Sequence, residues 1–453
     1  MAERAMSVTP YWELTFDADG DVDGRERDRL LTQVTQRKVR DLVVFAHGWN
    51  NERSGATRLY SRFFEPIPAL APLAPLGYVG VVWPSMIFPD EPIPDFPASV
   101  AAAVTAVARP ALAKGARQAL VEVFPDRVTL VEQIARLLER HPDEGASLET
   151  FGQLVRLLVE ARPQDPQDAC AADTLATGGP AGGPEMLSGD TALVCRDFAR
   201  ALDQVASPHG TSPASGTADL SFTPAGLWDG AHELLRQATY YAMKRRAGTV
   251  GERGLGRVLG RLAQAAPDVR VHLVGHSFGG RLVSFALRGL PAGVRTVKSV
   301  TLLQGAFSHY AFAARLPHDT HASGALHGLQ SRIDGPLVCC YSRFDSALGT
   351  MYPLASRMAG DARSAAGELG AGFDIGRTLG PQWGALGHDG VQAVDGTRAF
   401  TLAEALRTKL PTSGCVNVDA AAVVKRGGPP TGAHSDIVHR ELAQVVLAAG
   451  RIR

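Results

Sequence analysis

The chain has 453 residues, 45% of them hydrophobic, and its 46 basic and 46 acidic side chains leave no formal net charge. This composition is typical of a globular protein with one large domain and insertions, or with two domains. Without a basic excess, nothing favours nucleic-acid binding. The 5 cysteines follow no metal-binding or disulfide spacing. No apolar signal core and no apolar run of bilayer length are present, so we expect a cytoplasmic protein.

The N-terminal part predicts a strand at residues 11–16 and then an aspartate-rich turn at 17–24. Counted from Asp19, the turn matches the first half of a calcium-binding loop. The twelfth position is Leu30, where such a loop needs a bidentate glutamate. The turn is therefore predicted to cap a helix at residues 25–34.

A continuous apolar stretch at residues 42–46 predicts a strand in a parallel sheet that is covered on both faces. It leads directly into His47, Gly48 and Trp49. Taken alone, these residues fit an ordinary strand-to-helix turn, with Asn50 or Asn51 as the helix cap. A helix at 56–64 and a strand at 77–83 follow, and this alternation predicts a parallel sheet.

The pattern changes after residue 86. Apolar residues recur at helical spacing between residues 98 and 160, for example Val131, Ile134, Leu137 and Leu138, and later Leu154, Leu157 and Leu158. We expect a helical insertion here, with apolar faces that pack on the core or on a bound apolar group. Stretches 161–190 and 206–226, rich in glycine, proline and serine, predict mobile loops around a helix at 193–205.

A helix is predicted at residues 234–247, and it ends in the basic run Lys244, Arg245 and Arg246. Basic side chains at a helix C-terminus complement the helix dipole, which predicts a solvated helix end. The alternative is a site for an anionic headgroup, which would allow contact with a membrane surface.

The most informative stretch lies near residue 275. A valine-rich strand at 269–274 leads into Gly275, His276, Ser277, Phe278 and Gly279, and apolar residues at helical spacing follow. G-x-S-x-G between a strand and a helix predicts a nucleophile elbow, a turn that exposes the serine hydroxyl. Glycine is needed where side chains would collide with the neighbouring backbone. We expect His47 and His276, which flank these motifs, to pack or hydrogen-bond nearby.

This segment resembles the nucleophile elbow of the α/β-hydrolase superfamily. The resemblance implies an α/β fold with a mostly parallel central sheet flanked by helices, here with a large helical cap. It also implies that the N–H groups of Phe278 and Trp49 bind the oxyanion, with Gly48 allowing close approach to the substrate. The expected division is a hydrolase core at 1–86 and 229–453, interrupted by a cap at 87–228.

The triad partners are predicted by their places in the chain. Strands are expected at 296–303 and 335–341, and Asp345 follows the second of them at the edge of the sheet that carries the elbow. The alternative role of Asp345 is to cap the helix that follows it. Asp334 precedes its strand and would therefore lie at the opposite edge of the sheet. His434 lies between a predicted last strand at 415–419 and a closing helix at 438–449, which fits the order Ser, Asp, His better than His388 does.

The expected activity is that of a serine hydrolase that needs no metal or cofactor and acts on a small ester or lipid through an acyl-enzyme. The resemblance makes an esterase or lipase the first hypothesis. A peptidase or amidase with the same triad, and a catalytically silent binding module, stay open as alternatives. The oligomeric state is not predicted.

Overall fold

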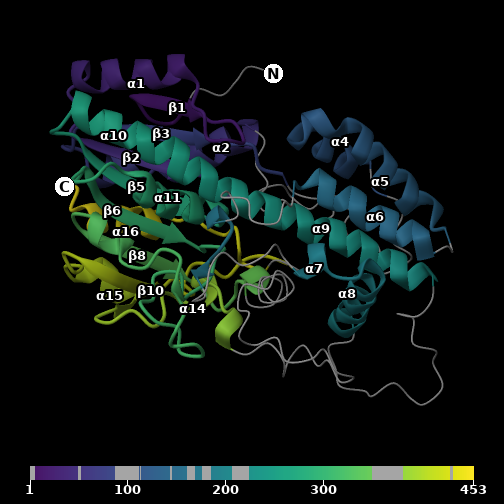
Figure 1. Cartoon of the computed structure of the whole chain (residues 1–453). Coiled ribbons are helices and arrows are strands. Elements are labelled where there is room, and N and C mark those ends of the chain that lie inside the picture. Colours follow the sequence, from purple (N-terminus) through teal and green to yellow (C-terminus); the bar gives the residue numbers. More distant parts are fainter. Residues whose placement is uncertain are drawn as a thin grey trace.

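The computed structural model describes residues 6–48, 53–86, 112, 114–142, 145–160, 169–175, 185–206, 224–348, 381–428 and 432–453. These residues form an α/β structure in which helices flank a central sheet (Figure 1). Trp49 and large parts of the predicted cap and its loops, including residues 87–111, 161–168 and 207–223, lie outside the described residues.

All neighbouring strands of the central sheet pair in parallel, which confirms the predicted sheet. The strands of the central sheet are β1 (Tyr11–Thr15), β2 (Asp41–Ala46), β3 (Leu76–Val82), β5 (Arg270–His276), β6 (Val297–Leu303), β8 (Pro336–Tyr341), β9 (Arg398–Thr401) and β10 (Gly414–Asp419). Two further short strands, β4 (Thr174–Leu175) and β7 (Ser323–Gly324), form a separate antiparallel pair. The strand at 174–175 lies where none is predicted.

The order of strands across the sheet is β1-β3-β2-β5-β6-β8-β10-β9. The chain proceeds from β2 towards one edge of the sheet and from β5 towards the other. Where neighbouring strands lead in opposite directions, as β2 and β5 do, their carboxyl ends form a switch point, and ligands of open α/β sheets bind there. Ala46 at the end of β2 pairs with Gly275 of β5, so the segments that follow these two strands meet at that point.

Helices connect these strands, and some of them cover the two faces of the sheet. They are α1 (Gly24–Gln36), α2 (Arg53–Phe64), α3 (Ile67–Leu70), α4 (Lys114–Val123), α5 (Val128–Arg140), α6 (Gly145–Leu158), α7 (Glu185–Ser188), α8 (Thr191–Ala206), α9 (Pro224–Thr249), α10 (Gly256–Ala265), α11 (Phe278–Gly289), α14 (Leu386–Asp389), α15 (Leu402–Arg407) and α16 (Arg440–Gly450). Short helical turns lie at Pro125–Arg127, Leu329–Arg332 and Pro381–Trp383, and a π-helical stretch at Val250–Leu255 joins α9 to α10.

Strand β2 shows why the core strands contain long apolar stretches. Its side chains alternate between the two faces, as strand geometry requires. Leu42 and Val44 lie in the apolar cluster that contains residues of α10 and α11, whereas Val43 and Phe45 lie in the cluster that contains residues of α2 and α16. Both faces are therefore buried, and residues 42–46 are apolar without interruption.

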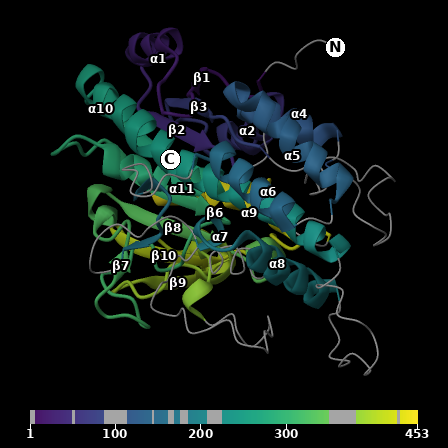
Figure 2. The same cartoon turned by 45° about the vertical axis from the view of Figure 1, so that its right-hand side comes forward.

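Helix α9 extends from the sheet into the group formed by α4, α5, α6 and α8 (Figures 1 and 2). Val131, Ile134 and Leu138 are buried there in one cluster with residues of α9, whereas Leu157 is exposed. The described part of the predicted helical region is thus helical. Helix α9 begins at Pro224 rather than at residue 234, and it continues across the expected domain boundary at residue 228.

The basic run on α9 is not a solvated helix end, and that prediction is wrong. The Lys244 side chain is 2% exposed, and its Nζ lies 3.0 Å from Asp173 Oδ2. Arg245 donates to two carbonyl oxygens just beyond the end of α6, and Arg246 donates to that of Pro84. Helix α9 continues to Thr249, beyond these three cations. Their side chains bind acceptors from neighbouring segments and are not solvated. They do not form an open headgroup site.

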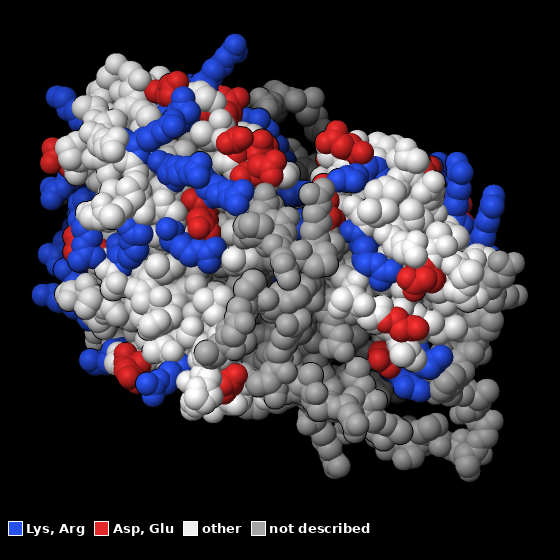
Figure 3. Space-filling view, in the orientation of Figure 1, with Lys and Arg blue, Asp and Glu red and all other residues white. Residues whose placement is uncertain are grey.

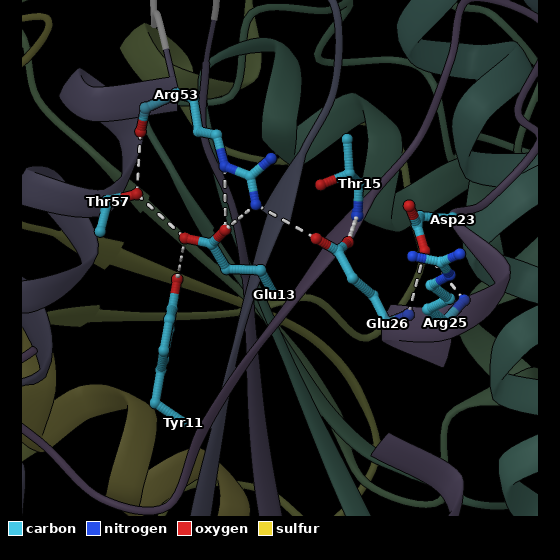
Figure 4. A network of polar contacts seen from close by, with 8 residues as sticks. All are labelled: Tyr11, Glu13, Thr15, Asp23, Arg25, Glu26, Arg53 and Thr57. Carbon is cyan, nitrogen blue, oxygen red and sulfur yellow. Dashed lines mark hydrogen bonds and ion pairs between the residues drawn. The ribbon is translucent and has the colours of Figure 1, made fainter. Parts of the chain in front are cut away.

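The aspartate-rich turn caps α1 as predicted, because the Asp23 carboxylate accepts from backbone N–H groups of the first helical turn. The polar contacts beyond this cap tie edge strand β1 to two helices (Figure 4). Glu26 of α1 accepts from the N–H of Thr15. Arg53, at the start of α2, donates to both Glu26 and Glu13. The start of α2 is therefore fixed against β1.

The surface charges and the cysteines of the structure agree with what the sequence indicates. Acidic and basic side chains are interspersed over the described face of Figure 3, as expected for a chain without net charge. All 5 cysteines are free and buried, in agreement with a sequence that shows no disulfide spacing. No helix among the described residues is long and apolar enough to cross a bilayer.

Candidate active site

Ser277 occupies a strained turn between β5 and α11, with φ 54° and ψ −123°. Positive φ is uncommon for a residue with a Cβ, and strain of about 1–3 kcal/mol persists only where the surroundings enforce it. The Ser277 N–H donates to the Leu303 carbonyl over 3.1 Å, and its own carbonyl accepts from Ala306 over 3.2 Å. Both contacts hold the turn, so the serine hydroxyl projects at the carboxyl edge of the sheet.

The glycines around this turn are required by close backbone approach. A Cβ on Gly275 would lie 2.4 Å from the carbonyl oxygen of Gly279, and a Cβ on Gly279 would lie 2.0 Å from that of Ala46. A Cβ on Gly48 would lie 2.6 Å from the Cβ of Ser277. The segment after β2 is therefore in contact with the serine.

Gly279→Ala is expected to lower the free energy of unfolding by about 1–3 kcal/mol or more, the usual cost of forcing extra atoms against a rigid neighbour. The added methyl would meet backbone oxygens of β2 and His47, and these cannot move without disturbing the sheet. Urea unfolding measures the change. Gly145→Ala, on α6, is the control because a Cβ there would have no described atom within 4 Å. Equal stability of the two variants would contradict the close packing of the elbow.

Three side chains from distant parts of the chain form a hydrogen-bonded series. Ser277 Oγ lies 2.9 Å from His434 Nε2, and His434 Nδ1 lies 2.8 Å from Asp345 Oδ2. A carboxylate accepts from Nδ1–H, which leaves the Nε2 lone pair directed at the serine hydroxyl. The structure thus brings together the three side chains predicted as nucleophile, base and acid.

Asp345 is fully buried, and its two oxygens have different partners. Oδ2 bonds to His434, whereas Oδ1 accepts from the N–H of Leu348 over 3.0 Å. The carboxylate therefore also caps the turn that follows it, so the alternative role predicted for this residue is present as well. Because both oxygens are bound, the carboxylate has a fixed orientation towards the imidazole.

The loop that carries His434 is tied to the loop that carries Asp345. The N–H of Ala433 donates to the carbonyl of Phe344 over 2.8 Å. The histidine considered as an alternative, His388, lies on α14 and pairs through Nδ1 with Asp389 over 2.7 Å. Asp334 lies at the opposite edge of the sheet, as predicted, where it pairs with Lys298.

Of the two predicted oxyanion donors, one lies within the described residues. Phe278 is the first residue of α11 and directly follows Ser277, so its N–H lies at the positive end of the helix dipole. The second donor, Trp49, lies outside the described residues, although the preceding Gly48 is in contact with the serine.

His47 is fixed at the end of β2 by contacts on several sides. Its Nδ1 lies 2.8 Å from the Gly48 carbonyl, which can only accept, so Nδ1 carries the proton. Its backbone N–H donates to the Tyr60 hydroxyl over 2.9 Å. Its ring stacks on that of Trp83, with 5.6 Å between centroids. These contacts fix the His47 ring and the Gly48 carbonyl that it binds.

The buried histidines make folding stability depend on pH. Burial lowers the pKa of His276 to about 3 and that of His47 to about 4. An unfolded histidine has a pKa of about 6.5. Below pH 6.5 the unfolded chain binds protons that the folded protein does not, so acid destabilises the fold. Between pH 6.5 and 5, we expect these two groups to lower the free energy of unfolding by about 3 kcal/mol.

Urea unfolding at several pH values measures this dependence. His388 acts in the opposite direction, because its hydrogen bond with Asp389 raises its pKa, and its contribution is lost as pH rises. His276→Gln removes one titrating ring and should reduce the mean slope between pH 6.5 and 5 by about 1.1 kcal/mol per pH unit. A slope that is unchanged in this variant would show that His276 is not buried as a neutral ring.

Among the described residues, no group of three or more histidine, cysteine, aspartate or glutamate side chains is arranged to hold a metal ion. Comparisons with models of protein families, with curated proteins and with solved structures gave no significant match.

Proposed function

We propose that this chain is a serine hydrolase of the α/β-hydrolase fold that cleaves carboxylic esters through an acyl-enzyme intermediate. The observation that carries the proposal is the series from Ser277 through His434 to Asp345, with distances of 2.9 and 2.8 Å. Its position at the switch point of a parallel sheet, where substrates of open α/β proteins bind, gives independent support.

In this mechanism, Ser277 Oγ attacks the ester carbonyl while His434 Nε2 takes the hydroxyl proton. Asp345 holds the imidazole in the required tautomer and stabilises its charged form. The N–H of Phe278, with that of Trp49 as the second donor, stabilises the oxyanion; losing one such donor typically lowers the rate about 10²–10³-fold. His434 then gives the proton to the departing alcohol. Water attacks the acyl-enzyme by the same steps and releases the acid.

A fluorophosphonate probe tests the proposal, because it labels activated serines covalently. Intact-mass measurement should show one label on the wild type and none on Ser277→Ala. Ser284→Ala is the matched control, because Ser284 is buried on α11 and donates to the carbonyl of Gly280. This variant should label like the wild type. An unlabelled, folded wild type, or a label that persists in Ser277→Ala, would contradict the proposal.

A p-nitrophenyl ester series of increasing acyl length then defines the substrate. Turnover that depends on Ser277 would establish ester hydrolysis, and the preferred length would measure the space available for the acyl group. We expect an apolar acyl group to be favoured over a sugar.

A further inference from the structure

We propose that His276 is a positioning residue, which holds the general base His434 in line with Ser277 by binding its backbone carbonyl. This inference rests on the proposed function, and it adds to the triad a side chain that touches none of the reacting atoms.

The contact that carries the inference joins the elbow to the loop of the base. His276 Nε2 lies 2.9 Å from the carbonyl oxygen of His434, and the two ring centroids are 5.1 Å apart. His276 directly precedes Ser277 at the end of β5. The side chain before the nucleophile therefore binds the main chain of the residue that must deprotonate it.

The state of the ring follows from its surroundings. A carbonyl oxygen can only accept, so His276 Nε2 carries a proton and donates it. Because burial holds the ring neutral, Nδ1 is unprotonated, and this atom has no hydrogen-bond partner among the described residues. Within that part of the chain, the hydrogen bond of the ring goes to His434. A neutral ring also places no positive charge beside the imidazolium that forms on His434 during the reaction.

The other side of the ring faces the segment that follows β2. A Cβ on Gly48 would lie 3.1 Å from His276 Nδ1 and 2.6 Å from the Cβ of Ser277. The ring therefore lies between Gly48 and the His434 loop, and its Nδ1 edge is close to the backbone that follows β2. The hydrogen bond from His276 therefore sets the distance between the elbow and the His434 loop.

The catalytic consequence comes from the geometry of proton transfer. His434 must take a proton from Ser277 and give it to the leaving alcohol, and a misplacement of about 1 Å at such a site costs about 10²-fold in rate. Without the bond from His276, the contact between Ala433 and Phe344 still links the His434 loop to the acid loop. The base would then be held towards Asp345 but not towards Ser277.

The test compares His276→Leu with His276→Gln. Leucine fills space without donating, whereas the glutamine amide nitrogen can take the place of the imidazole Nε2. We expect kcat for a p-nitrophenyl ester to fall about 10–100-fold in His276→Leu with KM nearly unchanged, and His276→Gln to recover most of the loss. The rate of fluorophosphonate labelling should follow kcat, because labelling also needs His434 as base.

The two proposals fail in different ways. An unlabelled wild type would overturn the proposed function and, with it, the role of His276. A labelled wild type with kcat of His276→Leu within about two-fold of normal would overturn the role of His276 alone. Equal losses in the leucine and glutamine variants would do the same, since a packing defect does not distinguish them. If His276→Leu does not fold, His276→Asn replaces it, because its shorter amide cannot reach the carbonyl and kcat should still fall below that of His276→Gln.

Discussion

Ser277→Ala and His434→Ala are each expected to lower kcat for a p-nitrophenyl ester by about 10⁶, and the double variant should be no slower than either. The reason is that, in the proposed mechanism, the hydroxyl and the imidazole act on one proton, which their 2.9 Å separation allows. Once either is absent, the other has nothing to activate. Catalysis that remains would come from oxyanion stabilisation and substrate binding. Steady-state kinetics of the three variants and the wild type measure the effect.

Asp345→Asn is the graded control for this prediction. The amide has one acceptor oxygen in place of the two that bind His434 and Leu348, and it cannot stabilise the charged imidazolium, so we expect kcat to fall by about 10⁴. Urea unfolding must show that each variant is folded. Additive losses in the double variant, or a full rate for His434→Ala, would show that the serine and the histidine do not act as a unit.

The site could be predicted from sequence to the extent that local pattern and chain order define it. Ser277 lies in a motif whose strand and helix are both visible as apolar periodicity. Asp345 and His434 lie far from it in the chain, and only the order of strands and the parallel sheet relate them. The bond between His276 and the His434 carbonyl could not be predicted, because it depends on how two loops are spaced in the fold.

For the fold as well, the pattern of apolar residues predicts some elements and not others. Strand β2 is apolar on both faces and is therefore easily recognised. Strand β9 (Arg398–Thr401) lies at an edge of the sheet and is largely exposed, so it carries neither an apolar run nor an alternating pattern that would predict it. The burial of Lys244 has no local signal either, because its partner Asp173 lies on a segment distant in sequence.

That partner lies at the centre of a buried ionic cluster formed by Asp173, Lys244 and Arg281. Asp173 Oδ1 accepts from Arg281, and Oδ2 lies 3.0 Å from Lys244 Nζ and accepts from the N–H of Ser308 over 3.0 Å. The cluster joins segment 169–175 to α9 and to the elbow helix α11. Part of a stretch predicted as a mobile loop is therefore held in the interior, where ions are stable only with their partners.

Asp173→Asn is expected to lower the free energy of unfolding by about 3–5 kcal/mol, the usual cost of removing one partner of a buried ion pair. The neutral amide would face two cations, Arg281 and Lys244, whose side chains are 0% and 2% exposed. Asp334→Asn is the matched control, because its pair with Lys298 is largely exposed and should contribute at most about 1 kcal/mol. Urea unfolding of both variants decides the matter. Equal, small losses would mean that Asp173 does not neutralise the buried cations, whereas a large loss at Asp173 alone would show that segment 169–175 is fixed to the elbow helix by charge.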